Sequence, residues 1–403
     1  MKPYEKFVDN ILGAVRSSQG KDPAAATAII QEALQAAGLM GSVASPTRAT
    51  EAAGKAPFVD LNPPPAWAPG ARQRAAGPDA GAGTDSGSGA NANGLQDWMA
   101  RLKSGLAGQG MPGRDRSVDP ATHGPGEFLE GSFSNEAGTR RYRLYVPATP
   151  ASGPRPLVVM LHGCKQDPED FAAGTTMNLL AEESGCLVLY PEQAAGANHS
   201  QCWNWFEARH QQRDQGEPSL IAGMTRQVLR EHGGDPARVY VAGLSAGGAM
   251  AAVMAAAYPE LYAAAGVHSG LPVGGAHDLM SGLNAMKGAP KKMREGAKVG
   301  KPVPVIVFHG DRDAVVHPSN GQATFHQFTQ GAGARGLETR EERGQGHTRI
   351  TALDGAGRVV AEHWTLHGAG HAWSGGSTAG SYAVASGPDA SSEMLRFFLS
   401  CGS

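Results

Sequence analysis

Short runs of hydrophobic residues recur along the second half of the chain, each with the length of a strand that is buried on both faces. The runs are Leu157–Leu161, Cys186–Tyr190, Val239–Ala242 and Val303–Phe308. Segments with helical patterning lie between them, at Leu220–Glu231 and Ala249–Ala257. Strands that alternate with helices form βαβ units around a parallel sheet. The pattern therefore predicts an α/β fold with a mostly parallel sheet flanked by helices.

A more polar pattern precedes and follows these runs. Tyr142, Leu144 and Val146 alternate with polar residues, as in a strand with one face in water. Near the other end, Val359–Leu366 alternates in the same way and is predicted to be the final strand. We therefore assign residues 127–403 to one α/β domain, which has a normal size for this class.

The first part of the chain has a different composition. Residues 1–40 carry apolar side chains at spacings of three and four, which predicts two short helices. Residues 41–126 are rich in Ala, Gly, Pro and Ser, and contain too few large apolar groups to offset the entropy of ordering. We interpret them as a low-complexity linker with one short helix near Leu95–Leu102. The helices of residues 1–40 either dock on an unknown partner or cap the α/β domain.

Charge and hydropathy exclude several classes of partner. The 403 residues carry a formal net charge of −2, so the chain has no electrostatic footprint for nucleic acid or an anionic membrane. No stretch approaches the roughly 20 apolar residues that a membrane-spanning helix needs. The N-terminus is charged early and lacks a continuous apolar core, which is not typical of a secretory signal peptide. We therefore expect a cytoplasmic protein.

The four cysteines do not suggest a metal site. They stand at Cys164, Cys186, Cys202 and Cys401, and no two form a C-x-x-C pair. The spacing therefore does not predict zinc, and we expect no bound metal. Four cysteines allow three disulfide pairings, among which the sequence cannot choose. Since no export signal is visible, we expect free buried thiols.

The strongest chemical signal is a G-x-S-x-G motif at Gly243–Gly247, centred on Ser245. It follows a predicted strand and precedes an alanine-rich helix, which is the context of the nucleophile elbow in α/β-hydrolases. Small flanking residues let the neighbouring backbone pass close to the strained turn, and the helix dipole favours negative charge at the site. We therefore predict an α/β-hydrolase with Ser245 as its nucleophile.

A serine nucleophile needs a base and an orienting acid, which follow in this fold in the order acid and then histidine. Asp311 and Asp313 both lie just past the strand Val303–Phe308. We favour Asp313, because it is far enough along the loop to turn back towards a histidine, whereas Asp311 can bond backbone amides of the turn. His371 is the predicted base, since it stands in a loop directly after the final strand.

The oxyanion hole requires two backbone N–H groups. One is expected from Ala246, the residue after the nucleophile, and the other from Cys164, in the loop that follows the strand Leu157–Leu161. His162 in the same loop is expected to be structural.

Tryptophans near these motifs are candidates for substrate contact. Trp203 and Trp205 lie in one dense aromatic loop, and Trp373 closely follows His371. Tryptophan offers flat apolar area with one N–H, which suits a cleft for an acyl chain or an aromatic acid. Ordinary core packing is the alternative for all three.

Five motifs, taken in order, resemble the esterase family of poly(3-hydroxybutyrate) depolymerases, which includes feruloyl and acetylxylan esterases. The resemblance covers about residues 128–400. It rests on Leu161-His-Gly-Cys164-Lys-Gln166, Cys202-Trp-Asn-Trp-Phe206, Gly243-Leu-Ser-Ala-Gly-Gly248, His309-Gly-Asp-Arg-Asp313-Ala-Val-Val316 and Gly370-His-Ala-Trp-Ser-Gly-Gly376.

The resemblance implies an α/β-hydrolase fold without a cofactor, and a catalytic triad of Ser245, Asp313 and His371. It implies an ester substrate, polymeric or not, with polyhydroxybutyrate or its oligomers as the main expectation and feruloyl or acetylxylan esters as the alternative. Because secreted depolymerases of this kind generally carry a signal peptide and a polymer-binding domain, we expect amorphous or short substrates rather than crystalline polymer. An extracellular location is the alternative to the cytoplasm. A non-catalytic scaffold is the alternative of another class.

Overall fold

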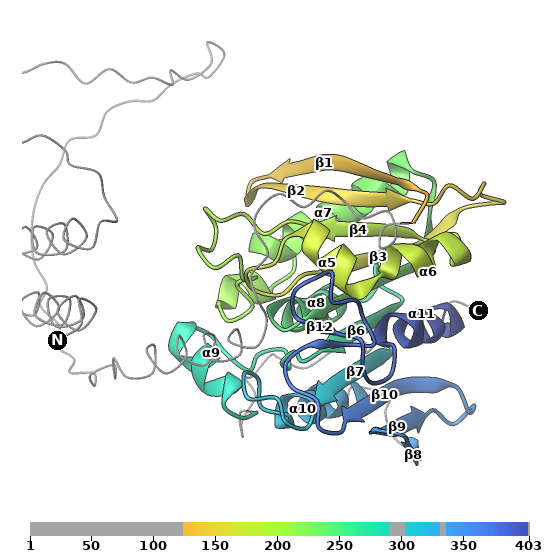
Figure 1. Cartoon of the computed structure of the whole chain (residues 1–403). Coiled ribbons are helices and arrows are strands. Elements are labelled where there is room, and N and C mark those ends of the chain that lie inside the picture. The colour runs from red at the N-terminus through yellow and green to blue at the C-terminus, as the bar shows by residue number, and fades with distance from the viewer. Residues whose placement is uncertain (1–123, 290–302, 331–335, 402–403) are drawn as a thin grey trace, which may run out of the picture. The chain divides into compact units, whose positions relative to one another are not determined.

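The computed structural model describes residues 124–289, 303–330 and 336–401 (Figure 1). The helices expected within residues 1–40 lie outside the described residues, as does the linker helix expected near Leu95–Leu102. The described part of the chain forms a ten-stranded sheet with helices on both faces.

The sheet has the strand order β1-β2-β4-β3-β5-β6-β7-β10-β9-β8, and Figure 1 shows it running from β1 at the top to β8 at the bottom. Its central strands, from β4 to β10, are parallel, and both ends are antiparallel hairpins. The strands span Glu127–Asn135 (β1), Gly138–Val146 (β2), Arg155–Leu161 (β3), Leu187–Pro191 (β4), Gly234–Leu244 (β5), Ala264–His268 (β6), Val305–Gly310 (β7), Glu338–Gly344 (β8), His347–Leu353 (β9) and Val359–Leu366 (β10). A small separate sheet pairs Trp373–Ser374 (β11) with Ala383–Val384 (β12).

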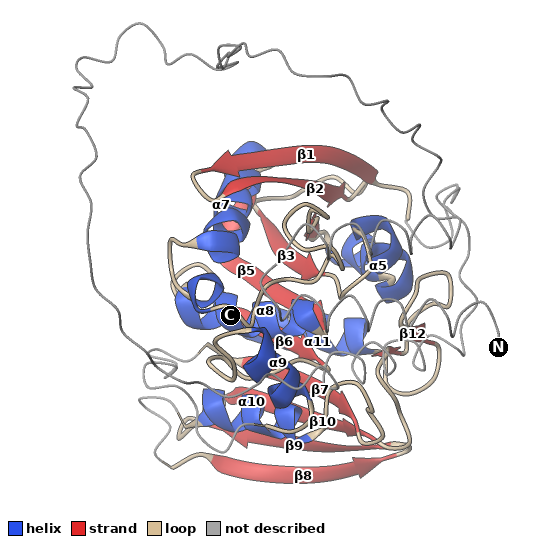
Figure 2. Ribbon diagram, turned by 90° about the vertical axis from the view of Figure 1, so that its left-hand side faces the viewer, coloured by secondary structure: helices blue, strands red, loops and turns tan. Residues whose placement is uncertain are grey.

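The described helices connect and cover these strands, and Figure 2 shows them around the sheet. They span Pro168–Thr175 (α5), Met177–Ser184 (α6), Gly216–Glu231 (α7), Ala246–Ala257 (α8), Leu279–Met286 (α9), Ser319–Thr329 (α10) and Ala390–Cys401 (α11), with a short 3-10 turn at Ala208–Gln211 (η1).

Two hydrophobic cores lie on opposite faces of the sheet. Leu157 and Val159 of β3 point into the core covered by α7, α8 and α10, whereas Val158 and Met160 point into the core covered by α5, α6 and α11. Because successive side chains of a strand alternate between faces, a strand covered on both sides must be apolar at every position. The four hydrophobic runs therefore lie in the central strands β3, β4, β5 and β7, and the predicted parallel α/β fold is confirmed.

The edge strand β8 has the opposite composition. All seven of its residues are exposed, and its sequence Glu-Thr-Arg-Glu-Glu-Arg-Gly gave no strand signal. It pairs with β9 alone, at the end of the sheet. Charged side chains on an edge strand discourage pairing with further strands.

The turn between β5 and α8 places Ser245 at the carboxyl end of the sheet. Ser245 has a φ of 58° and a ψ of −117°, in the left-handed half of conformational space that non-glycine residues rarely adopt. Its N–H donates to the His268 carbonyl at 2.9 Å, which ties the turn to the end of β6.

Glycines beside Ser245 are required by close backbone packing. A Cβ atom at Gly247 would overlap the Leu161 carbonyl oxygen at the end of β3, and one at Gly243 would lie 2.6 Å from that same oxygen. The turn that carries Ser245 therefore rests directly on the loop that carries Cys164, and no side chain fits between them.

Gly247→Ala is expected to destabilise the protein by at least the roughly 1–3 kcal/mol of an overpacked core position, because its Cβ can be accommodated only by a backbone shift. Urea unfolding measures the change. Gly153→Ala is the matched control, since a Cβ there meets nothing within 4 Å. Equal unfolding midpoints for the two variants would contradict the packing argument.

Candidate active site

The structure brings Asp313 and His371 together at the carboxyl end of the sheet. Asp313 lies in the loop after β7 and His371 in the loop after β10, and His371 Nδ1 is 2.7 Å from Asp313 Oδ2. The other carboxylate oxygen, Oδ1, accepts the backbone N–H groups of Val315 at 2.9 Å and Val316 at 2.8 Å. Both oxygens are therefore held, and the carboxylate has one defined orientation towards the imidazole.

The surroundings of Asp313 keep its carboxyl ionised. The side chain is fully buried, and burial alone would raise its pKa. The neighbouring imidazoles of His371 and His309 outweigh this effect and hold the pKa of the Asp313 carboxyl well below its usual range. A buried carboxylate that stays negative can orient an imidazole and stabilise it when it gains a proton.

Asp311 is engaged elsewhere. Its Oδ1 accepts the Gly368 N–H at 2.7 Å, and its Oδ2 lies 3.1 Å from His367 Nδ1. These contacts bind the loop after β7 to the loop after β10, so Asp311 supports the loop that carries His371 but does not face that histidine.

Ser245 and His371 line one cavity of about 490 Å³. Ala246 and Cys164, the expected oxyanion-hole residues, line it as well. Ala246 is the first residue of α8, where backbone N–H groups have no acceptor within the helix. The remaining wall is largely apolar and includes Trp205, Phe206, Leu271, Leu283, Met286 and Val315.

The loop that carries Cys164 is fixed from two sides. Gln166 accepts the Gly163 N–H at 2.9 Å, and its own amide donates to Asp170 and to the Ser381 carbonyl, both at 2.9 Å. His162 is buried, and its Nε2 accepts the Gln193 N–H at 3.1 Å, so its proton lies on Nδ1 and is donated to the Gly163 carbonyl. His162 therefore has the structural place that the sequence suggested.

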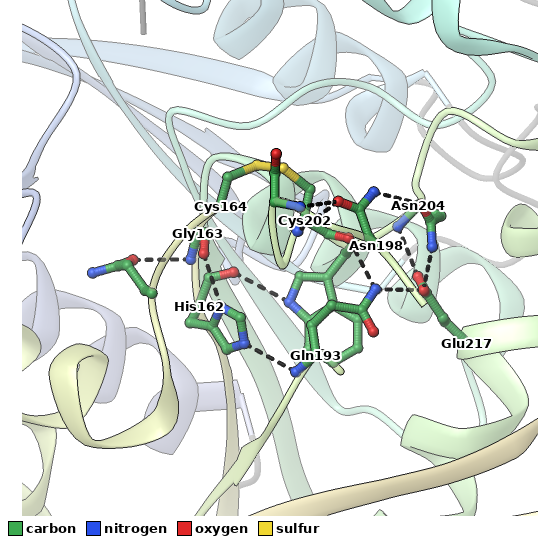
Figure 3. Close-up of a disulfide and its surroundings, with 11 residues drawn as sticks. His162, Gly163, Cys164, Gln193, Asn198, Cys202, Asn204 and Glu217 are labelled. Atoms are coloured by element: carbon green, nitrogen blue, oxygen red, sulfur yellow. Dashed lines mark hydrogen bonds between the residues drawn. A yellow bond between two sulfur atoms is a disulfide. The ribbon is translucent and has the colours of Figure 1, made fainter. Parts of the chain in front are cut away.

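The expectation of free thiols is wrong for two of the four cysteines. Cys164 and Cys202, 38 residues apart, form a disulfide (Figure 3). Cys186 and Cys401 are free. The expectation depended on the lack of a visible export signal, which says nothing about which residues meet in space. The bond joins the loop after β3 to the aromatic loop after β4, and both cysteines line the cavity.

A buried polar network lies beside the disulfide, on the side of Cys202, as Figure 3 shows. Glu217, at the start of α7, is almost completely buried and accepts the backbone and side-chain N–H groups of Asn204, each at 2.7 Å, together with the Gln193 amide. Gln193 also donates to the Cys202 carbonyl at 2.9 Å, and Asn198 accepts the Cys202 N–H at 3.3 Å. One buried carboxylate thus organises the backbone around Cys202, as buried charges require hydrogen-bonded partners.

Two of the three candidate tryptophans do not line the cavity. Trp203 is completely buried and donates from Nε1 to the His162 carbonyl at 3.1 Å, and Trp373 is buried and donates to Ser391 at 3.0 Å. Both side chains are packed in the interior and do not belong to the wall of this cavity. Trp205 does line the cavity. Sequence reasoning missed the apolar residues of α9, including Leu283 and Met286, because nothing local marks a short helix as a cavity wall.

Within the described ranges, no group of three or more His, Cys, Asp or Glu side chains is arranged to hold a metal ion. No described helix has the length and apolar character to cross a membrane.

The fold and the elbow define the chain as an α/β-hydrolase. A solved acetyl xylan esterase from Aspergillus awamori superposes with a TM-score of 0.54 at 22% identity, covering 68% of this chain and 99% of that one. Residues 140–351, more than half of the chain, match the family model described as Esterase PHB depolymerase, and the chain belongs to that family.

Two curated relatives illustrate the range of the family. The poly(3-hydroxyalkanoate) depolymerase C of Paucimonas lemoignei is 34% identical over 251 residues, covering 60% of each chain. A probable acetylxylan esterase A of Aspergillus fumigatus is 30% identical over 234 residues, covering 54% of this chain and 61% of the relative. The chain thus spans about three fifths of the length of the curated relatives that it matches.

Asp313→Asn is expected to lower kcat by roughly 10⁴, because an amide cannot hold His371 in the tautomer that a base requires. Asp311→Asn should cost less than about tenfold, since Asp311 contacts only the supporting loop. Steady-state hydrolysis of a soluble ester at saturating substrate compares the two. The reverse order of losses would move the orienting acid to Asp311.

Loss of the Cys164–Cys202 disulfide is expected to lower both stability and activity. Removing the bond in Cys164→Ser/Cys202→Ser should cost about 3–4 kcal/mol for a loop of this length. It should also lower kcat/KM, because it releases the loop that carries Cys164, an expected oxyanion-hole residue. Thermal unfolding and ester hydrolysis are measured with and without dithiothreitol. Cys401→Ala is the control and should respond to the reductant as wild type does. A wild type insensitive to reduction would contradict this role.

Proposed function

We propose that this protein hydrolyses carboxylic esters with Ser245 as nucleophile, His371 as general base and Asp313 as the orienting acid. The observation that carries the proposal is the 2.7 Å contact between His371 and Asp313 beside a strained Ser245 that lines the same cavity. Membership of an esterase family supports the same reaction class.

In the proposed reaction, Ser245 Oγ attacks the ester carbonyl carbon while its proton passes to His371 Nε2, the ring nitrogen that does not face Asp313. The carbonyl oxygen becomes negative and is stabilised by the N–H groups of Ala246 and Cys164. Collapse of this intermediate breaks the ester C–O bond, and His371 gives its proton to the departing alcohol. Water then attacks the acyl-serine by the same route, releasing the acid and restoring Ser245.

For the substrate, we favour polyhydroxybutyrate or its oligomers. The largely apolar cavity suits a short alkyl ester, and a relative at 34% identity carries the name of a poly(3-hydroxyalkanoate) depolymerase. Arg312 is the only lysine or arginine among the described residues that line the cavity, and it would attract the carboxylate end of a hydroxy-acid oligomer. Acetylxylan or feruloyl esters are the second candidate, supported by the names of other relatives.

For the location, we propose an extracellular or other oxidising compartment in place of the cytoplasm. Disulfides persist in such compartments and are rare where thiols are kept reduced. The Cys164–Cys202 bond supports this choice.

Ser245→Ala is expected to lower kcat on p-nitrophenyl butyrate by several orders of magnitude with an unchanged unfolding midpoint, because triad members act as a unit. Ser132→Ala, at an exposed position of β1, is the matched control and should behave as wild type. An inactive wild type would favour the non-catalytic scaffold, and an active Ser245→Ala would exclude this serine as nucleophile.

The same purified protein is then offered amorphous polyhydroxybutyrate, 3-hydroxybutyrate trimer, methyl ferulate and acetylated xylan. The proposed substrate class predicts the highest kcat/KM on the trimer and release of soluble acid from the polymer. A higher kcat/KM on ferulate or acetylxylan would replace the first candidate by the second.

A further inference from the structure

A second imidazole faces the buried carboxylate of Asp313. His309 lies near the end of β7 and is only 1% exposed. Its Nε2 lies 3.4 Å from Asp313 Oδ2, the same oxygen that faces His371, and 2.9 Å from the Val316 carbonyl oxygen. His309 therefore approaches the proposed acid from the side of the sheet, whereas His371 approaches it from the cavity.

The contacts of His309 fix where its proton lies. A carbonyl oxygen only accepts hydrogen bonds, so Nε2 must carry the hydrogen that points at Val316 and towards Asp313. The opposite nitrogen, Nδ1, is buried and has no hydrogen-bond partner among the described residues. It lies against Gly321 of α10, where a Cβ atom would come within 2.8 Å of it.

Packing alone does not explain why an imidazole occupies this position. A buried nitrogen without a partner costs free energy that an apolar ring of similar size would avoid. What the imidazole adds over such a ring is one N–H, and that N–H is directed between the Val316 carbonyl and the Asp313 carboxylate.

We propose that His309 is a positioning residue of the reaction centre, whose Nε2–H restrains the Asp313 carboxylate and weakens its hold on His371. The proposal rests on the proposed function, because it assigns to Asp313 the role of orienting acid. With His309 in place, each oxygen of the carboxylate faces two N–H groups. Two backbone amides face Oδ1, and two imidazoles face Oδ2.

Two further buried histidines lie on the strands that pair with β7 on either side. Burial, together with the fields of His309 and His371, lowers the pKa of His268 at the end of β6 to about 3. Burial, with the fields of His309 and His326, lowers the pKa of His363 on β10 to about 4. Both are neutral in the range where an esterase of this kind would be assayed, so neither competes as a charge beside Asp313.

Replacing His309 by phenylalanine removes the N–H and keeps the ring. Asp313 Oδ2 then bears more negative charge towards His371 Nδ1 and stabilises the protonated imidazole more strongly. The acidic limb of the pH profile of kcat/KM should therefore move upward by about 0.5–1 pH unit. His309→Gln, whose amide nitrogen can take the place of Nε2, should restore the wild-type limb.

The test records pH profiles of p-nitrophenyl butyrate hydrolysis and unfolding midpoints for wild type, His309→Phe, His309→Gln and, as matched control, His363→Phe. His363 is also buried, and its Nε2 has no hydrogen-bond partner among the described residues, but it makes no hydrogen bond or ion pair with Asp313 there. The proposal is supported if the acidic limb moves upward in His309→Phe but not in His309→Gln or His363→Phe. An unshifted limb in folded His309→Phe, or the same shift in His363→Phe, overturns it.

The two proposals fail in different ways. Activity that survives Ser245→Ala contradicts the proposed mechanism, in which Ser245 is the nucleophile. Activity that depends on Ser245 but has the same pH profile with and without the His309 imidazole removes only the role of His309. If His309→Phe does not fold, His309→Gln and His309→Leu carry the same comparison, since only the former keeps an N–H.

Discussion

The contact between the end of β3 and the turn after β5 sets the relative positions of the segments that form the candidate site. The Leu161 carbonyl lies where a side chain at Gly247 would be, so the turn that carries Ser245 and the loop that carries Cys164 are seated on each other. The proposed mechanism needs two amide donors within hydrogen-bond distance of one developing oxyanion, one from each of these segments. The glycines set that spacing through backbone atoms alone, which makes it independent of side-chain rotamers.

A second layer of structure fixes the loops that the glycines bring together. The disulfide and the buried Glu217 network restrain the cavity wall on one side. On the other side, Asp311 joins the loops after β7 and β10, and so fixes the separation of Asp313 and His371. The disulfide, the Glu217 network and the Asp311 contacts thus all fix the positions of the site loops before substrate binds.

The sequence predicted the parts of this structure that leave a local pattern. Strands covered on both faces must be apolar throughout, so β3, β4, β5 and β7 were visible as runs, and the elbow was visible as glycines around Ser245. The charged strand β8 was missed, because an edge strand exposed on both faces has no reason to alternate. The sequence does not distinguish a tryptophan packed in the core, such as Trp203 or Trp373, from one that lines a cavity, because both positions require a large apolar ring. The disulfide was missed because proximity between loops 38 residues apart is decided by the fold.

The order of the sheet also has a consequence for how the protein reaches its native state. The candidate site is assembled from the ends of β3, β5, β7 and β10, so its residues, from Cys164 to His371, span most of the described chain. Parallel pairing of distant strands requires long loops to close first and is intrinsically slow. A partly folded molecule that lacks the β7–β10 pairing would hold Ser245 on its turn but would not bring His371 to Asp313. Under the proposed mechanism such a molecule would be inactive, and ester hydrolysis would begin only once β10 has paired with β7.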